Sequence, residues 1–283
     1  MSGKSKRFLS NTVIYILLII VFIFAMFPVF YTLMGSFKSN QELLAGGTNI
    51  IPKDFVLENY TDAWRLGNFK QYTFNSIFMS TFIVIGSIIT STTAGYVFER
   101  GEFKYKNVIF AMVISSMFVS LGSLTLYPTL MIAKAMHINK TLWGVIIIRV
   151  FGLNVTNLFI SRSYIQSISR EIDEAAKIDG CSFFGIFTRI IFPLCKPLIA
   201  TLGILEFRAS WNDYMLPLVF TLSSPERMPL VVGVVNLKTT GEAASSWNLM
   251  LAGASLAMIP MIIIYIIFNR YFIEGLTTGA VKG

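Results

Sequence analysis

Acidic residues gather in a polar segment, residues 169–193, which separates two long apolar runs of this 283-residue chain. The acids are Glu171, Asp173, Glu174 and Asp179. Between them stands one base, Lys177. Carboxylates on a short helix form ion pairs with basic residues of another protein. The chemistry that this segment suggests is therefore docking to a partner. We call residues 169–193 the elbow.

A second polar set, which we call the stripe, falls inside the apolar run 198–220. Glu206, Ser210 and Asp213 recur at i, i+4 and i+7, which places them on one face of a helix. Three more residues of the same half of the run are counted with the stripe: Trp211, Asn212 and Tyr214. Together the six residues offer acceptors, donors and aromatic rings, which is the chemistry that a sugar needs. Alternatively, the stripe is a polar seam against another chain, or it holds an internal pair between Glu206 and a nearby arginine, Arg208 or Arg149.

The elbow has the local signals of two short helices. Ser169 can cap the first, whose acidic first turn suits the helix dipole, and Gly180 ends it. Ser182 can cap a second helix, Phe183 to Phe192, which we expect Pro193 to stop. The pattern thus predicts helix, glycine turn, helix.

One face of the first helix is apolar but thin. Ile172, Ala175 and Ala176 share it by their i, i+3, i+4 spacing, and two alanines let another surface come close. Such a face suits a groove on a partner protein. The alternative is a helix lying on lipid headgroups, which would favour Lys and Arg over acids. The acidic composition favours the partner.

The elements that must position these residues are membrane helices. The chain is 54% hydrophobic and only 13% charged, with a mean hydropathy of +0.67. Runs long enough to cross a bilayer predict six transmembrane helices in an all-α polytopic membrane protein. The first run continues uncharged from residue 13 to 34, too long for the apolar core of a signal peptide. The six expected spans are residues 12–35, 73–98, 108–133, 142–161, 198–220 and 247–269.

Basic residues predict the orientation of these spans. With both termini inside, the inner segments hold 13 lysines and arginines against 8 in the outer segments. The positive-inside rule therefore favours an N-in, C-in topology and a cytoplasmic elbow. We attribute the net charge of +8 to the basic residues that set the membrane topology rather than to a nucleic-acid-binding site. Cys181 and Cys195 do not predict a disulfide framework, and with His137 as the single histidine no metal site is expected.

The elbow also carries a family resemblance. Glu174-Ala175-Ala176, then Gly180, Ile190 and Phe192-Pro193 at their spacing, resemble the cytoplasmic signature of bacterial ABC import permeases. The family form ends in Leu-Pro, so Phe192 is a mild departure. Three longer stretches resemble the carbohydrate branch of the family: DEAAKIDGCSFFGIFTRIIFPLCKPLIATL, SWNDYMLPL and RYFIEGLTTGAVKG. The last of them resembles the end of the maltose-importer-type second permease subunit.

The resemblance implies a type I ABC importer permease fold over residues 1–283, in the bacterial cytoplasmic membrane. It implies that the elbow is a coupling helix that docks on a cytoplasmic ATPase. The docking residues would be Glu174, Ala175, Ala176, Asp179 and Gly180. Because this chain has no G-x-x-x-x-G-K-[ST] phosphate loop, ATP and Mg would bind to separate subunits. This chain would bind no cofactor and would itself be no enzyme.

The expected partners are a second homologous permease, two ATPase subunits, an extracytoplasmic sugar-binding protein and membrane lipid, with no nucleic acid. The outer segment 223–248 resembles one that probes the binding protein, and the tail 275–283 resembles one that inserts between the ATPases. The stripe becomes the candidate sugar path, with Tyr127 and Asn248 as weaker candidates. In the maltose-type importer, sugar contacts come mainly from the other permease.

Two different functions remain as alternatives. A self-sufficient secondary transporter would need ionisable relays and broken helices in paired halves, and the sequence offers only the stripe. A membrane assembly factor without transport activity would not need the polar residues of the stripe. An ATP-driven sugar importer is the leading prediction.

Overall fold

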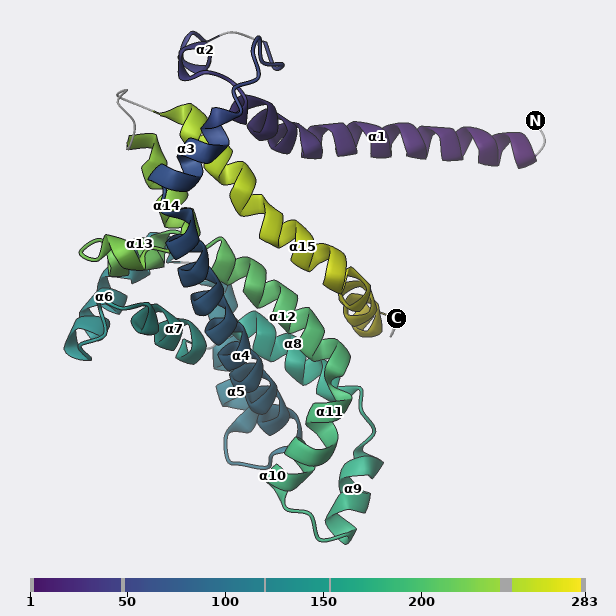
Figure 1. Ribbon diagram of the computed structural model, residues 1–283. Coiled ribbons are helices and arrows are strands. Elements are labelled where there is room, and N and C mark those ends of the chain that lie inside the picture. The colour runs from purple at the N-terminus through teal and green to yellow at the C-terminus, as the bar shows by residue number, and fades with distance from the viewer. Residues whose placement is uncertain (1–2, 47–48, 120, 153, 240–245, 281–283) are drawn as a thin grey trace. The chain divides into compact units, whose positions relative to one another are not determined.

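Every regular element of the described chain is a helix. The computed structural model describes residues 3–46, 49–119, 121–152, 154–239 and 246–280 (Figure 1). The chain forms two compact units, one of residues 1–69 with 233–259 and one of residues 70–232 with 260–283. Each unit is compact in itself, and one domain over residues 1–283 stays a prediction. The α-helices are α1 Gly3–Ser36, α2 Asn40–Leu44, α3 Glu58–Leu66, α4 Phe69–Arg100, α5 Lys106–Ser115, α6 Leu126–Ala135, α7 Leu142–Phe151, α8 Val155–Gln166, α9 Arg170–Ile178, α10 Phe183–Ile186, α11 Phe192–Leu194, α12 Lys196–Trp211, α13 Met215–Thr221, α14 Leu230–Asn236 and α15 Trp247–Ala280.

Three stretches are long and apolar enough to cross a membrane: Asn11–Ser36, Phe69–Arg100 and Trp247–Phe268. Two bent helix pairs reach span length if each counts as one, α7 with α8 at 46° and Phe183–Leu194 with α12 at 77°. The described chain therefore has three to five candidate spans. Three of the predicted spans, 12–35, 73–98 and 247–269, fall on the three long apolar helices, whereas the other three fall on helices that are bent or interrupted. The number of spans and their bounds stay predictions.

The predicted span 108–133 is broken. α5 ends at Ser115, and short 3-10 turns at Ser116–Phe118 and Gly122–Thr125 come before α6. Hydroxyl side chains bond to the backbone here, Ser116 to the Val113 carbonyl at 2.6 Å and Thr125 to the Gly122 carbonyl at 2.9 Å. Such local bonds offer the backbone an alternative to helix. Hydropathy alone does not register this competition.

The predicted spans 142–161 and 198–220 are bent or ended by asparagine. The Asn154 side chain caps α8 by accepting from the Asn157 amide, so the chain restarts a helix there. Asn212 donates to the Arg208 carbonyl at 2.9 Å at the end of α12. α12 begins earlier than expected, at Lys196, where Pro197 suits the first helical turn. Polar side chains thus cut apolar runs into pieces.

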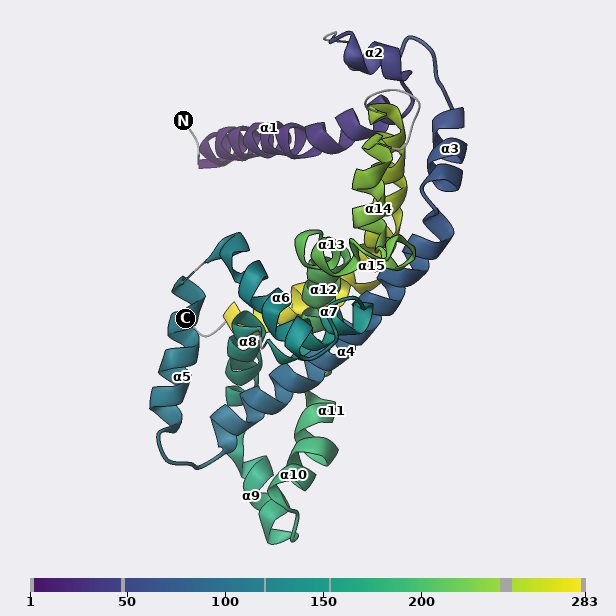
Figure 2. The same cartoon turned by 90° about the vertical axis from the view of Figure 1, so that its left-hand side faces the viewer.

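The second unit is built around α4, with α8 and α12 lying beside it in both views (Figures 1 and 2). Two glycines let neighbouring helices approach α4 closely. A Cβ on Gly86 would lie 2.5 Å from Val150 of α7, and one on Gly95 would lie 2.7 Å from Ser161 of α8. Small residues at helix contacts are typical of membrane proteins, where close packing replaces the hydrophobic drive.

Two apolar cores follow from this packing. One gathers Tyr96, Ile165, Ile191 and Leu198 with neighbours from α9 to α12, and it lies at the Arg100 end of α4. The other joins α4 to α6, α7 and α13 through residues such as Met79, Val145 and Phe220. α4 therefore contributes to both cores of its unit.

The first unit is held by a buried amide network. Asn59 on α3 donates at 2.8 Å to the carbonyls of Ser36 and Lys38. Asn248 at the start of α15 donates to Asn59 Oδ1 at 2.7 Å. The end of α1, α3 and α15 are tied together by these bonds.

Candidate functional site

The elbow folds as helix, glycine turn, helix, as predicted. Ser169 caps α9 by accepting from the Glu171 amide at 3.3 Å. Gly180 adopts φ +79°, a conformation that favours glycine. Its amide donates to the Lys177 carbonyl at 3.0 Å, and the Cys181 amide donates to the Ala176 carbonyl at 2.9 Å. These two bonds form a Schellman motif, which satisfies the last carbonyls of the helix.

Four of the five predicted docking residues are exposed: Glu174, Ala175, Asp179 and Gly180. Ala176 is the exception. Its side chain is buried in the apolar core with Ile165 and Ile191. The expectation that Ile172, Ala175 and Ala176 form one open face is therefore wrong, because α9 turns Ala176 inward and leaves the other two on the surface.

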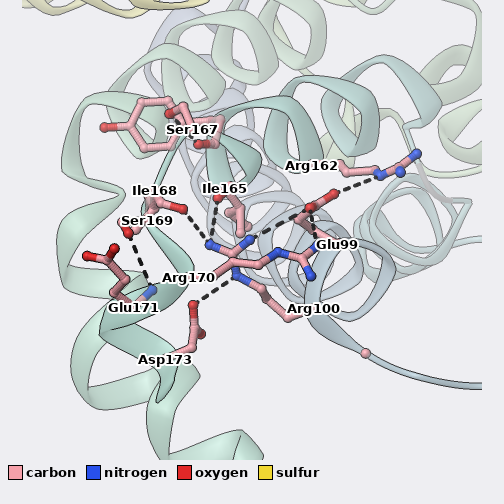
Figure 3. Close-up of polar contacts among 12 residues, drawn as sticks. Glu99, Arg100, Arg162, Ile165, Ser167, Ile168, Ser169, Arg170, Glu171 and Asp173 are labelled. Carbon is pink, nitrogen blue, oxygen red and sulfur yellow. Dashed lines mark hydrogen bonds and ion pairs between the residues drawn. The ribbon is translucent and has the colours of Figure 1, made fainter. Parts of the chain in front are cut away.

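Buried charge fixes α9 to α4, as Figure 3 shows. Asp173 is buried, and its Oδ2 accepts from Arg100 Nε at 2.9 Å. Arg100 Nη2 also donates to the carbonyls of Ile165 and Ile168, at 3.2 and 2.6 Å. The arginine thus binds the end of α8 and the first turn of α9 at once. Asp173 is an anchor rather than a surface acid.

Glu99, beside Arg100, completes this charge cluster. Its carboxylate lies 3.1 Å from Arg170 Nη2, 3.2 Å from Arg162 Nε and 3.7 Å from Arg100 Nη1 (Figure 3). Glu99 is only 5% exposed, and the three surrounding guanidinium groups compensate its buried charge. We define the charge cluster as Glu99, Arg100, Arg162, Arg170 and Asp173. Sequence reasoning missed it, although Glu99 is the single acid in residues 69–100.

The second helix of the elbow also contacts α4. The Tyr96 ring lies 4.6 Å from that of Phe183 and 5.0 Å from that of Phe187, and the Tyr96 hydroxyl donates to the Phe183 carbonyl at 3.2 Å. After α10 the chain makes a π turn at Phe187–Ile191 and continues through Pro193 to Leu194. The expectation that Pro193 ends the helix is wrong, because proline is tolerated in the first turn of the short α11.

The exposed tip of the elbow carries apolar side chains that the sequence analysis did not single out. Ile178 is 87% exposed at the end of α9, and Phe184 is also exposed on α10. They flank Gly180 on the two helices. Exposed apolar groups beside acids are typical of a protein interface. The contrast with the buried Ala176 marks which side of α9 is free.

The stripe on α12 splits into buried and accessible parts. Glu206 is buried and accepts from the side-chain amides of Asn154 and Asn157, both at 2.6 Å. The alternative of an internal pair between Glu206 and Arg149 or Arg208 is therefore wrong. The amides come from the start of α8, so the carboxylate joins α12 to α8. Glu206 serves packing between these helices.

The next residues of the stripe differ in the same way. Ser210 is buried and donates to the Phe207 carbonyl at 3.2 Å. Trp211 is buried and stacks on the Phe207 ring at 5.3 Å between centroids. Asn212 is exposed just past the end of α12.

Asp213 lies against an open hollow of about 330 Å³. Its Oδ2 is 3.4 Å from Arg149 Nε of α7, and both side chains are only partly exposed. The wall is otherwise polar or small on one side, with residues such as Ser123 and Thr129. A hollow with a paired acid and base can bind hydroxyl groups by donating and accepting hydrogen bonds.

The weaker candidates lie elsewhere. Tyr127 is 71% exposed on α6, and Asn248 is engaged with Asn59 in the first unit. The expected outer segment 223–248 includes residues 240–245, which are outside the described residues. In the predicted tail, the backbone is helical to Ala280, and residues 281–283 are outside the described residues. The roles expected of these two segments stay predictions.

Comparison with known proteins assigns these features to a family. Residues 91–277 match the family described as "Binding-protein-dependent transport system inner membrane component". The arabinooligosaccharides transport system permease protein AraQ of Bacillus subtilis is 34% identical over 261 residues, which is 91% of each chain. The galactooligosaccharides transport system permease protein GanQ of the same organism is 30% identical over 99% of this chain and 98% of its own length.

Further matches agree with these. The inner membrane ABC transporter permease protein YcjP of Escherichia coli is 31% identical over 99% of this chain and all of its own length. Among solved structures, a chain of a bacterial ABC transporter involved in the import of the acidic polysaccharide alginate superimposes with a TM-score of 0.78. It is 24% identical and covers 96% of this chain and 99% of its own, so it shows the same helical fold.

Proposed function

This chain belongs to the family of binding-protein-dependent transport system inner membrane components, and from that premise we propose that it is the permease subunit of an ATP-driven importer of sugars, in particular oligosaccharides. It is an inner-membrane, multi-pass permease. The ATPase activity lies on separate subunits. Arabino- and galacto-oligosaccharide permeases among its relatives support the substrate class.

The observation that carries the coupling role is that the tip of the elbow is exposed while the inward side of α9 is buried. Glu174, Asp179 and Ile178 are presented to solvent, while Asp173 and Ala176 are locked inward. A helix fixed from behind can receive a partner without being displaced from its own chain. The acids can form ion pairs with basic residues of an ATPase, and Ile178 and Phe184 can pack into an apolar cleft that those basic residues flank.

The family implies an ATPase, a binding protein and a paired permease as partners. We propose that two copies of a cytoplasmic ATPase bind ATP and Mg, that one of them receives the elbow, and that a homologous second permease completes the pathway. The binding protein would deliver sugar from outside to the segment around 223–248. The predicted N-in, C-in topology would put the elbow on the ATPase side.

The candidate sugar path narrows to the hollow beside Asp213. Glu206, Ser210 and Trp211 are buried in packing, which leaves Asp213 with Arg149 as the partly accessible polar pair. The neighbouring Ser123 and Thr129 add hydroxyl groups to the same wall. We propose that this hollow contributes hydrogen bonds to a passing sugar, alongside contacts from the other permease.

The coupling role is tested by the double variant Glu174→Lys with Gly180→Pro. Lysine reverses the charge of the docking face, and proline cannot adopt φ +79° or donate to the Lys177 carbonyl. We expect the variant to remain in the membrane but to lose ATPase copurification and sugar uptake. Glu102→Lys, a reversal of an exposed acid in the turn after α4, is the matched control.

The two readouts separate the alternatives. Retained copurification and uptake in the double variant would show that the ATPase docks elsewhere. Gradient-driven sugar uptake by the purified chain alone in liposomes would instead support the secondary transporter.

A further inference from the structure

α4 is attached to the rest of its unit by polar bonds at both ends. It runs without a proline from Phe69 to Arg100, and Asn75 and Arg100 are about 38 Å apart at 1.5 Å per residue. This exceeds the roughly 30 Å of a bilayer's hydrocarbon core. A helix that crosses the membrane along this stretch has its two attachment points on opposite sides.

At one end α4 holds both helices of the elbow. Arg100 pairs with Asp173 of α9 at 2.9 Å, and Tyr96 contacts Phe183 of α10 through its ring and its hydroxyl. The side chains of Arg100, Asp173 and Tyr96 are buried, whereas Phe183 is exposed. The elbow therefore cannot move away from α4 without breaking a buried ion pair and an aromatic contact.

At the other end α4 holds the segment between α13 and α14. Asn75 Nδ2 donates to the carbonyls of Glu226 and Met228, at 2.9 and 3.0 Å. Ser76 Oγ accepts from the Leu230 amide at 2.8 Å. Gln71 donates to Asn75 Oδ1 at 3.2 Å, which fixes the orientation of the amide. Asn75 and Ser76 are buried, so these bonds are shielded from water.

Between its ends α4 is packed too closely to slide. Val150 and Ser161 fill the space where a Cβ would stand on Gly86 and Gly95, which locks α4 against α7 and α8. The other helix leaving the elbow, α12, is joined through a bend of 77°. A push on the elbow is therefore directed more directly into α4 than into α12.

We propose that α4 is the rigid element that carries movement of the elbow to the segment 225–230 on the opposite side of the membrane, with Arg100, Asp173, Asn75 and Ser76 as positioning residues. This inference rests on the proposed function, because the ATPase must move the elbow. Nucleotide binding at one side then changes the surface that faces the binding protein at the other side. The segment follows because three backbone groups are bonded to α4.

The test uses the assembled transporter in liposomes with Glu226→Cys, an exposed position of the segment. The labelling rate by a water-soluble maleimide is measured with and without MgATP and orthovanadate, relative to the complex lacking Glu226→Cys. We expect trapping of the nucleotide to change the rate by at least about threefold. Asn75→Ala with Ser76→Ala should bring the ratio of the two rates close to one, and so should Asp173→Asn at the far end of the helix.

Ser80→Ala is the matched control. Ser80 is buried on α4 one turn beyond Ser76, and within the described residues its hydroxyl has no hydrogen-bond partner. The ratio should stay at its parent value there. A merely structural loosening of the segment by Asn75→Ala with Ser76→Ala would raise both rates and preserve their ratio, so the ratio distinguishes transmission from local stability.

The outcomes are separate for the two proposals. If the parent complex retains no ATPase, the proposed function fails and the inference fails with it. If ATPase and uptake are retained but the ratio is unchanged by both positioning variants, α4 does not carry the movement. A ratio lost on Glu206→Gln but kept in the two positioning variants would assign transmission to α12 and overturn the inference.

Discussion

Replacing Arg100 by methionine should release α9 from the end of α4. The guanidinium donates to Asp173 and to the carbonyls of Ile165 and Ile168. Methionine keeps an unbranched side chain as far as the position of Nε but has no donor, so the buried Asp173 loses this ion pair. Removing one member of a buried pair costs about 3–5 kcal/mol, since the other charge is left uncompensated.

Arg170→Met is the matched comparison within the same charge cluster. Arg170 also binds Glu99, at 3.1 Å, but its side chain is 67% exposed against 6% for Arg100. An exposed pair contributes about 0–1 kcal/mol, because water screens it and the side chain loses entropy. The two methionine variants should therefore differ by at least about 2 kcal/mol in the stability of α9.

Backbone hydrogen exchange of residues 170–178 measures this local opening. Exchange in α9 should accelerate between about 10²-fold and about 4 × 10³-fold in Arg100→Met and less than about fivefold in Arg170→Met. α3, Glu58–Leu66, belongs to the other unit and is the internal reference. Equal acceleration in the two variants would refute the reasoning from burial, and unchanged exchange in Arg100→Met would show that the ion pair does not hold α9.

Two further predictions concern the faces of the site. Ala176→Leu overfills the buried core and should lower the stability of the elbow by about 1–3 kcal/mol, measured by the same hydrogen exchange. Ala175→Leu, on the exposed face, should change the stability by less than about 0.5 kcal/mol and instead weaken ATPase copurification. Asp213→Ala leaves Arg149 without its acid and should change uptake of a panel of oligosaccharides by about tenfold, about 1.4 kcal/mol, while the ATPase stays attached. Glu102→Ala, at an exposed acid in the turn after α4, is its control, and equal uptake in the two variants would remove the hollow from the pathway.

The division of the acids in the elbow has a functional meaning. Asp173 anchors the helix, and Glu174, its neighbour in sequence, faces outward. Successive residues on a helix point about 100° apart, so adjacent acids take opposite roles without any change in composition. A charge-reversal scan of this helix should therefore separate folding defects from docking defects residue by residue.

The interruptions of the apolar runs also bear on function. The predicted span 198–220 ends at Trp211, and the chain turns at Asn212 before α13. Asp213 lies in this turn, which brings it to the hollow beside Arg149 instead of into a continuous helix. Irregular backbone at membrane depth is tolerated where it is buried in protein or lines a cavity. The break is thus part of what makes the hollow.

Local chemistry in the sequence was sufficient for the helices of the elbow, their serine caps and the glycine turn, because each depends on residues within one or two turns. Hydropathy likewise pointed to the three long apolar helices, since an apolar stretch of about 20 residues has few alternatives in a bilayer. Sequence motifs also identified the family. These features share one cause, which is that neighbours along the chain determine them.

Tertiary structure alone decided which polar residues are partners. Arg100 and Asp173 are 73 positions apart, Glu206 and Asn154 are 52 apart, and Asn75 and Met228 are 153 apart. Spacing along one helix cannot show a contact between two helices, so the amide partners of Glu206 were not among the alternatives considered and the charge cluster was missed. The burial of Ala176 follows from the same fact, because the pattern shows a face but not what covers it.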